Sequence, residues 1–170
     1  MLFRSRLVVA IMLLVAGLLL APLAQRHLQA RQRTDLGERL LLGLGGAGDA
    51  GPIGSGDAAA AGPLRGRLAG HPDLLPVVAT RCVNCHAVDG SKRPPSAAAF
   101  GPALGPATLA RALARRGGPP SRYDADSLCR LLREGIDPAW VVFDASMPRY
   151  DISDAQCEAL WMRLARPSVF

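Results

Sequence analysis

The most apolar stretch of the chain lies at its N-terminus. Residues 7–24 read LVVAIMLLVAGLLLAPLA, eighteen positions without a charged side chain. That length is just enough for a helix that crosses a bilayer, so the pattern predicts a membrane anchor over residues 1–24. The basic residues ahead of the run, in MLFRSR, leave a cleavable signal peptide as the alternative. Cleavage after Ala24 would put Pro22 at the −3 position, which favours an anchor that stays attached.

The next segment, residues 25–70, changes character along its length. Its first part mixes polar and apolar positions and is expected to be partly helical, with Asp35 and Glu38 at the spacing of a capping box. From Gly43 onward it contains ten glycines and two prolines, which is typical of a flexible linker. An alternative is that GERLLL, residues 37–42, is the displaced start of the folded domain and that the glycines form a loop behind it.

Residues 71–170 have the pattern of a small helical domain. Apolar residues recur at helical spacing in short segments separated by proline and glycine, and no alternating strand is visible. The last helix is the best defined, because Ser153 and Gln156 have capping-box spacing and Pro167 follows. Gly135 stands where the preceding helix should stop. Helices are expected over residues 74–85, 109–116, 126–134 and 153–166.

The charge of the chain is concentrated near its apolar end. The formal net charge is +6, from 20 basic and 14 acidic residues. Five arginines and no acid fall within residues 1–33, where they would face lipid headgroups. The rest of the chain is close to neutral, so no nucleic-acid partner is expected. Aromatic residues make up only 5%, which hints that something other than large side chains fills the core.

One short motif holds much of the chain's reactive chemistry. The chain has four cysteines and three histidines. Two of the cysteines and one of the histidines lie in CVNCH, Cys82 to His86. This is the covalent attachment pattern of a c-type haem. Cys82 and Cys85, three apart on a helical turn, can reach the two vinyl groups on one porphyrin edge. A redox dithiol would need a βαβ neighbourhood, which is not apparent. A zinc site would need two further ligands at matched spacing, and these are not apparent either.

A methionine is the expected second axial ligand. Met147 stands in the polar loop DASMPRYDISD and is followed by a proline. The other methionines lie near the apolar N-terminal run or in the last helix, whereas a methionine in such a loop has no helical face to fill. A thioether suits haem iron and raises its reduction potential relative to a second histidine. The expected cofactor is therefore one haem c, with its iron held by His86 and Met147.

These motifs give the chain a specific resemblance. Residues 74–164 resemble a class I mono-haem cytochrome c. The resemblance implies an all-α fold of short helices wrapped around one covalent haem, here preceded by the transmembrane helix and the glycine-rich linker. Residues 71–170 would then be the haem domain. The segments that carry it are CVNCH, FGPAL at residues 100–104, YDADSLCRLLREGIDP at residues 123–138 and MPRYDISDAQCEAL at residues 147–160.

The resemblance also implies roles for single residues. A proline carbonyl in the loop after the motif would accept a hydrogen bond from the proximal imidazole, and Pro102 is the matching position, with Pro106 as a fallback. Such a bond would strengthen the donation of the histidine to iron. The chain departs from the family in its first helix, which has no aromatic ring, and at Arg163, where an aromatic is usual. Trp161 or the GERLLL segment would have to substitute.

Four further residues keep two interpretations each. Arg149 and Tyr150 adjoin the expected iron ligand and could bind haem propionates, or they are solvated loop residues. Cys129 and Cys157 lie on the two helices before and after the methionine loop. They could form a disulfide, or they are small apolar residues of the core, because sequence does not place their Cα atoms.

The expected function is one-electron transfer, not catalysis. Iron would cycle between Fe(III) and Fe(II) with both axial ligands retained, so no small-molecule substrate is expected. As the resemblance implies, haem is attached outside the cytoplasm. We therefore expect a single-pass protein of the inner membrane with its haem domain in the periplasm, or a soluble periplasmic protein if the N-terminal segment is cleaved.

The expected partners are redox proteins of a respiratory or dehydrogenase chain. Two other functions stay open at this point. The chain could be the haem-bearing subunit of a larger membrane dehydrogenase or oxidase, or a redox or gas sensor in which Met147 dissociates from iron.

Overall fold

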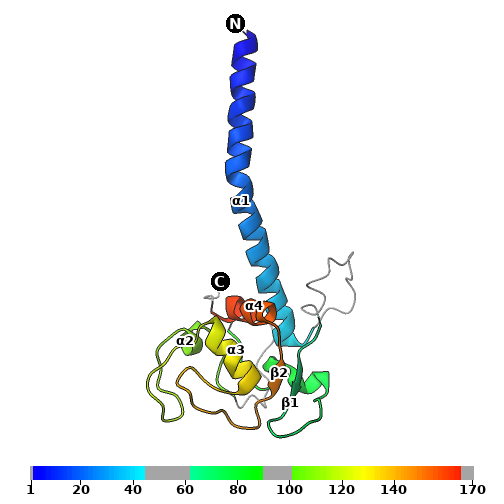
Figure 1. Ribbon diagram of the computed structural model, residues 1–170, viewed down its shortest axis with the longest axis vertical. Coiled ribbons are helices and arrows are strands. Elements are labelled where there is room, and N and C mark those ends of the chain that lie inside the picture. Colours follow the sequence, from blue (N-terminus) through cyan, green and yellow to red (C-terminus); the bar gives the residue numbers. More distant parts are fainter. Residues whose placement is uncertain (1, 45–61, 90–100, 166–170) are drawn as a thin grey trace. The chain divides into compact units, whose positions relative to one another are not determined.

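The computed structural model describes residues 2–44, 62–89 and 101–165 (Figure 1). Its contacts divide the chain into two units, residues 1–33 and 34–170. In chain order the elements are α1 (Leu2–Leu42), β1 (Arg65–Arg67), the 3-10 turns η2 (Val77–Thr80) and η3 (Cys82–Asn84), α2 (Pro106–Leu109), α3 (Ala125–Glu134), β2 (Arg149–Asp151) and α4 (Asp154–Leu164).

The N-terminal helix differs from the predicted anchor. α1 is continuous through Pro22 and runs past Asp35 and Glu38, so no new helix starts there. In the part of the chain that the structure describes, no helix is both long enough and apolar enough to cross a membrane. This finding does not support the predicted membrane anchor, nor the inner-membrane localisation with a periplasmic haem domain that depended on it.

The predicted fold class also needs correction. An all-α cytochrome c fold with a transmembrane helix and a glycine-rich linker is not what the structure supports. β1 and β2 form a two-stranded sheet. Residues 2–44, 62–89 and 101–165 contain no helix that could cross a membrane. The same residues contain no group of three or more His, Cys, Asp or Glu side chains that could hold a metal ion. Most of the linker, residues 45–61, lies outside the described residues. The described chain is a small and mainly helical protein.

The core of the second unit includes the end of α1. Leu40 and Leu41 are each only 1% exposed and pack with the apolar side chains of α3 and α4. Arg163 of α4 forms an ion pair with Glu38. Residues 37–42 therefore belong to the folded unit, as the alternative interpretation of GERLLL expected, because their leucines have no other apolar surface on which to be buried.

The last two helices form as the sequence predicts. The carboxylate of Asp124 accepts a hydrogen bond from the backbone N–H of Ser127 (2.8 Å) at the start of α3. Gly135 ends that helix in the left-handed region, with φ of 74°. At the start of α4, the backbone N–H of Ser153 donates to the side-chain oxygen of Gln156 (3.0 Å), which completes the predicted capping box.

A disulfide joins α3 to α4. Cys129 and Cys157 are bonded, with their Cα atoms 5.4 Å apart, and both side chains are buried. Of the two interpretations that the sequence left open for these cysteines, the structure selects pairing. The bond ties together the two helices that supply most of the buried leucines of the core.

The sheet is the element that sequence patterning missed. β1 and β2 are antiparallel, with Gly66 opposite Tyr150 and Arg67 opposite Arg149. Strands of three residues are too short to show an alternating pattern. Their effect on the site is direct, because β2 begins two residues after Met147 and β1 therefore holds the end of the methionine loop.

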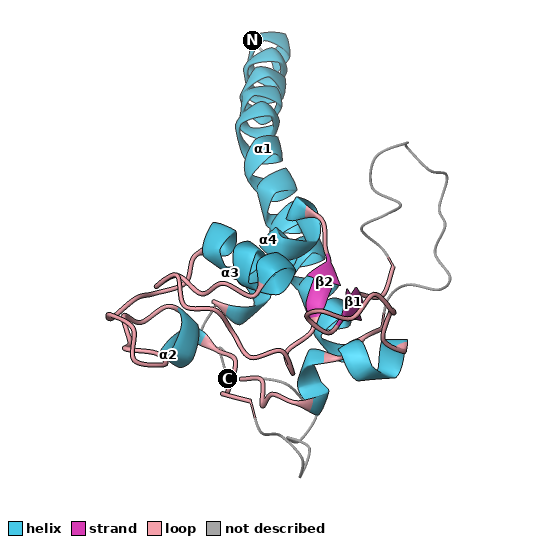
Figure 2. Cartoon of the chain, turned by 60° about the horizontal axis from the view of Figure 1, so that its bottom comes forward, coloured by secondary structure: helices cyan, strands magenta, loops and turns pink. Residues whose placement is uncertain are grey.

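Two predicted helices are wrong. Residues 74–85 form η2 and η3 with an extended break at Arg81, because Pro76 and the β-branched residues after it disfavour an α-helix. The helix expected over residues 109–116 is displaced to α2, which starts at Pro106 in the favoured first position. Loops make up most of residues 101–124 and 135–148, on either side of α3 (Figure 2).

Candidate functional site

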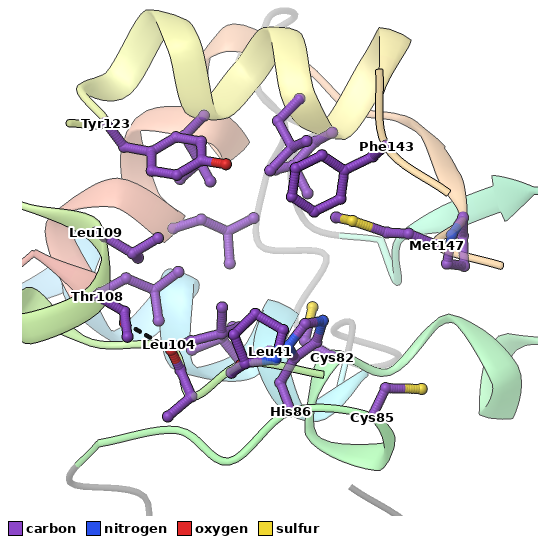
Figure 3. Close-up of a pocket in the computed structure, with 18 of the residues that line it drawn as sticks. Leu41, Cys82, Cys85, His86, Leu104, Thr108, Leu109, Tyr123, Phe143 and Met147 are labelled. Carbon is purple, nitrogen blue, oxygen red and sulfur yellow. Dashed lines mark hydrogen bonds between the residues drawn. The ribbon is translucent and has the colours of Figure 1, made fainter. Parts of the chain in front are cut away.

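A cavity of about 370 Å³ lies in the second unit, and the predicted site residues gather around it. Figure 3 shows Cys82, His86 and Leu104 below this space and Tyr123, Phe143 and Met147 above it. The walls are mainly apolar. Leucines contributed by the helices α1, α3 and α4 line it, namely Leu41, Leu128, Leu131, Leu132, Leu160 and Leu164.

Both cysteines of the motif line the cavity as free thiols. The η3 turn makes this possible, because the N–H of Cys85 donates to the carbonyl of Cys82 (3.2 Å) and the N–H of His86 donates to the same oxygen (2.9 Å). Burial raises the pKa of the Cys82 thiol to about 11. A thiol with so high a pKa is a poor redox nucleophile, which disfavours the dithiol alternative.

His86 has a fixed orientation. Its Nδ1 lies 2.7 Å from the carbonyl oxygen of Pro102. A carbonyl can only accept, so Nδ1 carries the proton and Nε2 keeps a lone pair that can bind a metal. Pro102, the position that the resemblance matched, makes this contact, whereas the fallback Pro106 begins α2. Thus the chain itself selects the tautomer that an iron ligand needs.

The loop that carries Pro102 is pinned against the motif. The N–H of Gly101 donates to the carbonyl of Cys85 (2.8 Å), and the N–H of Leu104 donates to that of Ala87 (2.7 Å). A Cβ atom on Gly101 would lie 2.5 Å from Nδ1 of His86. Glycine is therefore required here by the close approach of the imidazole ring, which forms the floor of the cavity.

Met147 lies on the wall opposite His86 (Figure 3). Its loop is a closed turn, in which the N–H of Met147 donates to the carbonyl of Asp144 (3.3 Å) and the N–H of Ser146 donates to the Asp144 carboxylate (2.8 Å). The side chain is partly buried against the core. The structure thus brings the thioether and the imidazole to two sides of one apolar space.

Arg149 and Tyr150 are already paired with the chain. Arg149 donates to the backbone carbonyls of Met147 and Phe143 and is not among the residues that line the cavity. Tyr150 lines it, but its hydroxyl donates to the carbonyl of Thr80 (3.2 Å). Burial is the main reason why the pKa of this phenol is raised. The structure therefore places only Tyr150 at the cavity and neither residue as a solvated loop side chain.

Several residues around the cavity were not predicted as site residues. Arg116 lines it, with its guanidinium 4.0 Å from the ring of Phe143. Arg115 lies over Tyr123, whose pKa is raised to about 12, chiefly by burial. Arg81 also lines it, and its buried Nε has no hydrogen-bond partner among the described residues. Only the adjacency of arginines to the cysteine motif and to a Gly-Pro turn could have signalled these roles.

The geometry of the cavity limits which metals its side chains could bind. A bound zinc ion would need more ligands than the cavity offers, since no cluster of three or more suitable side chains exists in the described part of the chain. The cavity therefore offers two thiols, one imidazole and one thioether around an apolar space.

Comparison with protein-family models, with curated proteins and with solved structures found no match for this chain.

Proposed function

We propose that this protein is a one-electron carrier, not an enzyme, and that it uses a single haem c attached in the cavity. The observation that carries the proposal is the position of Cys82, Cys85 and His86 opposite Met147 around one apolar cavity (Figure 3). A haem supplies one-electron chemistry, with iron alternating between Fe(III) and Fe(II). Cys82 and Cys85 would hold it by adding their S–H bonds across the C=C bonds of its two vinyl groups, and His86 and Met147 would hold its iron.

The residues present fit such a group. A volume of about 370 Å³ falls in the range of small-molecule and cofactor sites, about 300–1,000 Å³. The two thiols have no disulfide partner, and the Pro102 carbonyl leaves Nε2 of His86 available. A haem site needs only two protein ligands on its metal, because the porphyrin supplies four nitrogens. One imidazole and one thioether are therefore sufficient.

Each residue has a physical task in this proposal. The carbonyl of Pro102 holds the Nδ1 proton and makes the opposite nitrogen of His86 a stronger donor. The leucines of α1, α3 and α4 exclude water and so disfavour extra positive charge in the cavity. The thioether of Met147 would stabilise the softer, reduced metal relative to a second imidazole. All three effects concern electron affinity, and none of them binds or activates a substrate.

The proposed partners are redox proteins of a respiratory or dehydrogenase chain. If the chain fills both axial positions, no position is left on the metal for a small-molecule substrate. Val77 and Val78 in η2 are 43% and 56% exposed, and the next residue, Ala79, lines the cavity. An exposed apolar segment beside the cofactor suits the small and transient contacts of electron-transfer proteins.

The intact mass and the absorption spectrum of the protein test this proposal. The full chain, produced together with the machinery that attaches c-type haem, should gain the mass of one haem and show a methionine–iron charge-transfer band. Cys82→Ser/Cys85→Ser should gain no haem. The matched control Cys129→Ala/Cys157→Ala removes the other two cysteines and should keep it. Met147→Ala should retain the haem mass and lose the band.

Other outcomes would replace the proposal. A colourless protein with only its polypeptide mass would contradict it. Binding of carbon monoxide by the native reduced protein would favour the sensor, because it requires an open position on iron. A stable complex with a dehydrogenase or oxidase would make the chain a subunit of that enzyme.

A further inference from the structure

The side chain of Arg149 joins two backbone carbonyls of the methionine loop. Its Nη1 donates to the carbonyl of Met147 (2.6 Å) and its Nη2 donates to the carbonyl of Phe143 (3.0 Å). These two carbonyls lie at the two ends of the turn that Asp144 closes. One planar guanidinium thus fixes the distance across the loop, which the point charge of a lysine cannot do.

The guanidinium rests on the end of α3. A Cβ atom on Gly135 would overlap with Nε, Cζ and Nη2 of Arg149. The same glycine accepts a hydrogen bond at its carbonyl from the N–H of Phe143 (2.7 Å). Arg149 therefore connects three parts of the cavity wall, namely the C-terminus of α3, Phe143 and Met147.

The position of Arg149 is itself fixed. It stands in β2, opposite Arg67 of β1. Its side chain is partly buried. A buried cation is retained only where carbonyls or carboxylates compensate for the lost water. The carbonyls of Met147 and Phe143 provide this compensation, so the side chain and the loop hold each other in place.

We propose that Arg149 is a positioning residue that holds the Met147 thioether in the cavity and so sets how firmly it binds the metal. This deepens the proposed function and rests on it, because Met147 must be an axial ligand for the effect to be seen at iron. Arg149 acts through backbone carbonyls and does not touch the cofactor. Without it, the loop opens more often and Met147 yields its place to other ligands.

Competition with imidazole measures this opening in the haem-loaded protein. Exogenous imidazole binds only when Met147 has left, so its apparent affinity reports the fraction of open loops. A bond from a charged donor is worth about ten-fold in an equilibrium, so Arg149→Gln should bind imidazole roughly ten-fold more tightly than the wild type. Arg149→Lys should lie between them. Arg67→Gln removes the facing arginine of β1 and its exposed ion pair with Asp151. It should match the wild type, because exposed ion pairs contribute little.

Two glycines provide a second pair of variants. Gly135→Ala places a methyl group against the guanidinium and should weaken Met147 binding as Arg149→Gln does. Gly117→Ala is the control for backbone strain, because Gly117 also has a positive φ (78°) but a Cβ there would meet nothing within 4 Å. In the double variant Gly135→Ala/Arg149→Gln the clash is gone, so its loss should be smaller than the sum of the two single losses.

Hydrogen exchange separates the two possible failures. In the full chain, with or without haem, Arg149→Gln should speed amide exchange in residues 143–147 and Arg67→Gln should not. If the wild type carries no haem but Arg149→Gln still exchanges faster, the proposed function is wrong. The role of Arg149 in holding the methionine loop is then still supported. If Arg149→Gln changes neither the exchange rate nor the imidazole affinity, the positioning role is wrong. The proposed function would still be supported by the charge-transfer band of the wild type.

Discussion

Gly37 in the last part of α1 packs directly against the backbone of Ala159 in α4. A Cβ atom on Gly37 would overlap with the carbonyl oxygen of Ala159 and would lie 2.8 Å from Cβ of Arg163. Ala159 is completely buried. Two small residues thus allow the helix backbones to approach closely, and Leu41, one turn after Gly37, reaches the cavity from this contact.

Substitution of this glycine should loosen the second unit. Gly37→Ala inserts a methyl group where the obstacle is backbone, which cannot swing aside. We expect a loss of about 1–3 kcal/mol in the free energy of unfolding, as for other overpacked contacts. Urea unfolding measures it. Gly62→Ala is the control, since a Cβ there would meet nothing within 4 Å. Equal stability of the two variants would show that the α1–α4 contact is not tight.

Reduction of the disulfide should cost stability without removing the site. Cys129 and Cys157 are 28 positions apart, and closing a loop of that size stabilises a folded chain by about 3.6 kcal/mol in the chain-entropy model. Urea unfolding with and without reductant should differ by this order. Cys129→Ala/Cys157→Ala should behave like the reduced wild type and should not respond to reductant. A reductant effect of equal size in that variant would assign the loss to another cause.

The cap of α3 should make stability depend on pH. Hydrogen bonds from the side chain and the N–H of Ser127 hold the pKa of Asp124 below its ordinary value of 3.8. Because the folded pKa is the lower one, the cap stabilises the fold fully above the unfolded pKa, and this contribution is lost as pH falls through the folded pKa. Asp124→Ala should therefore cost about 1 kcal/mol at neutral pH, and the difference from the wild type should shrink in acid.

Asp124→Asn is the matched variant for this effect. It keeps a side-chain oxygen that can accept from Ser127 but cannot titrate. Its unfolding free energy should lie closer to that of the wild type at neutral pH, and its difference from Asp124→Ala should not change with pH. Urea unfolding between neutral pH and about pH 3 tests both statements. A gap between wild type and Asp124→Ala that stays constant over this range would contradict the assigned cause.

Local signals were sufficient for part of this structure. The capping pair of α4, Ser153 and Gln156, could be predicted because both side chains lie within one turn. The equally local pair of α3, Asp124 and Ser127, was not predicted. The contact of His86 with Pro102 was expected only from the family resemblance, since sixteen positions separate the two residues. Nothing in periodicity would have connected them.

Long-range packing accounts for what the sequence misjudged. Leu40 and Leu41 are buried with the apolar side chains of α3 and α4, which only the alternative interpretation of GERLLL expected. Arg149 was left open between a haem-propionate partner and a solvated loop residue, and in the structure two carbonyls within six residues bind its guanidinium. The apolar run at the N-terminus satisfied a length rule only at its lower limit, and the structure does not support a membrane helix.

The imidazole of His86 should be the most sensitive part of the site to its glycine neighbour. Gly101→Ala would force a methyl group against Nδ1 and so displace the ring or the Pro102 carbonyl that holds it. Because both cysteines are untouched, haem should still be attached, so intact mass should match the wild type. The absorption spectrum should change, and the reduction potential should shift, since the histidine donates less well when its hydrogen bond is lost. Gly62→Ala is the control, because a Cβ atom there would meet nothing within 4 Å. Spectra that change equally in both variants would show that the contact with His86 is not responsible.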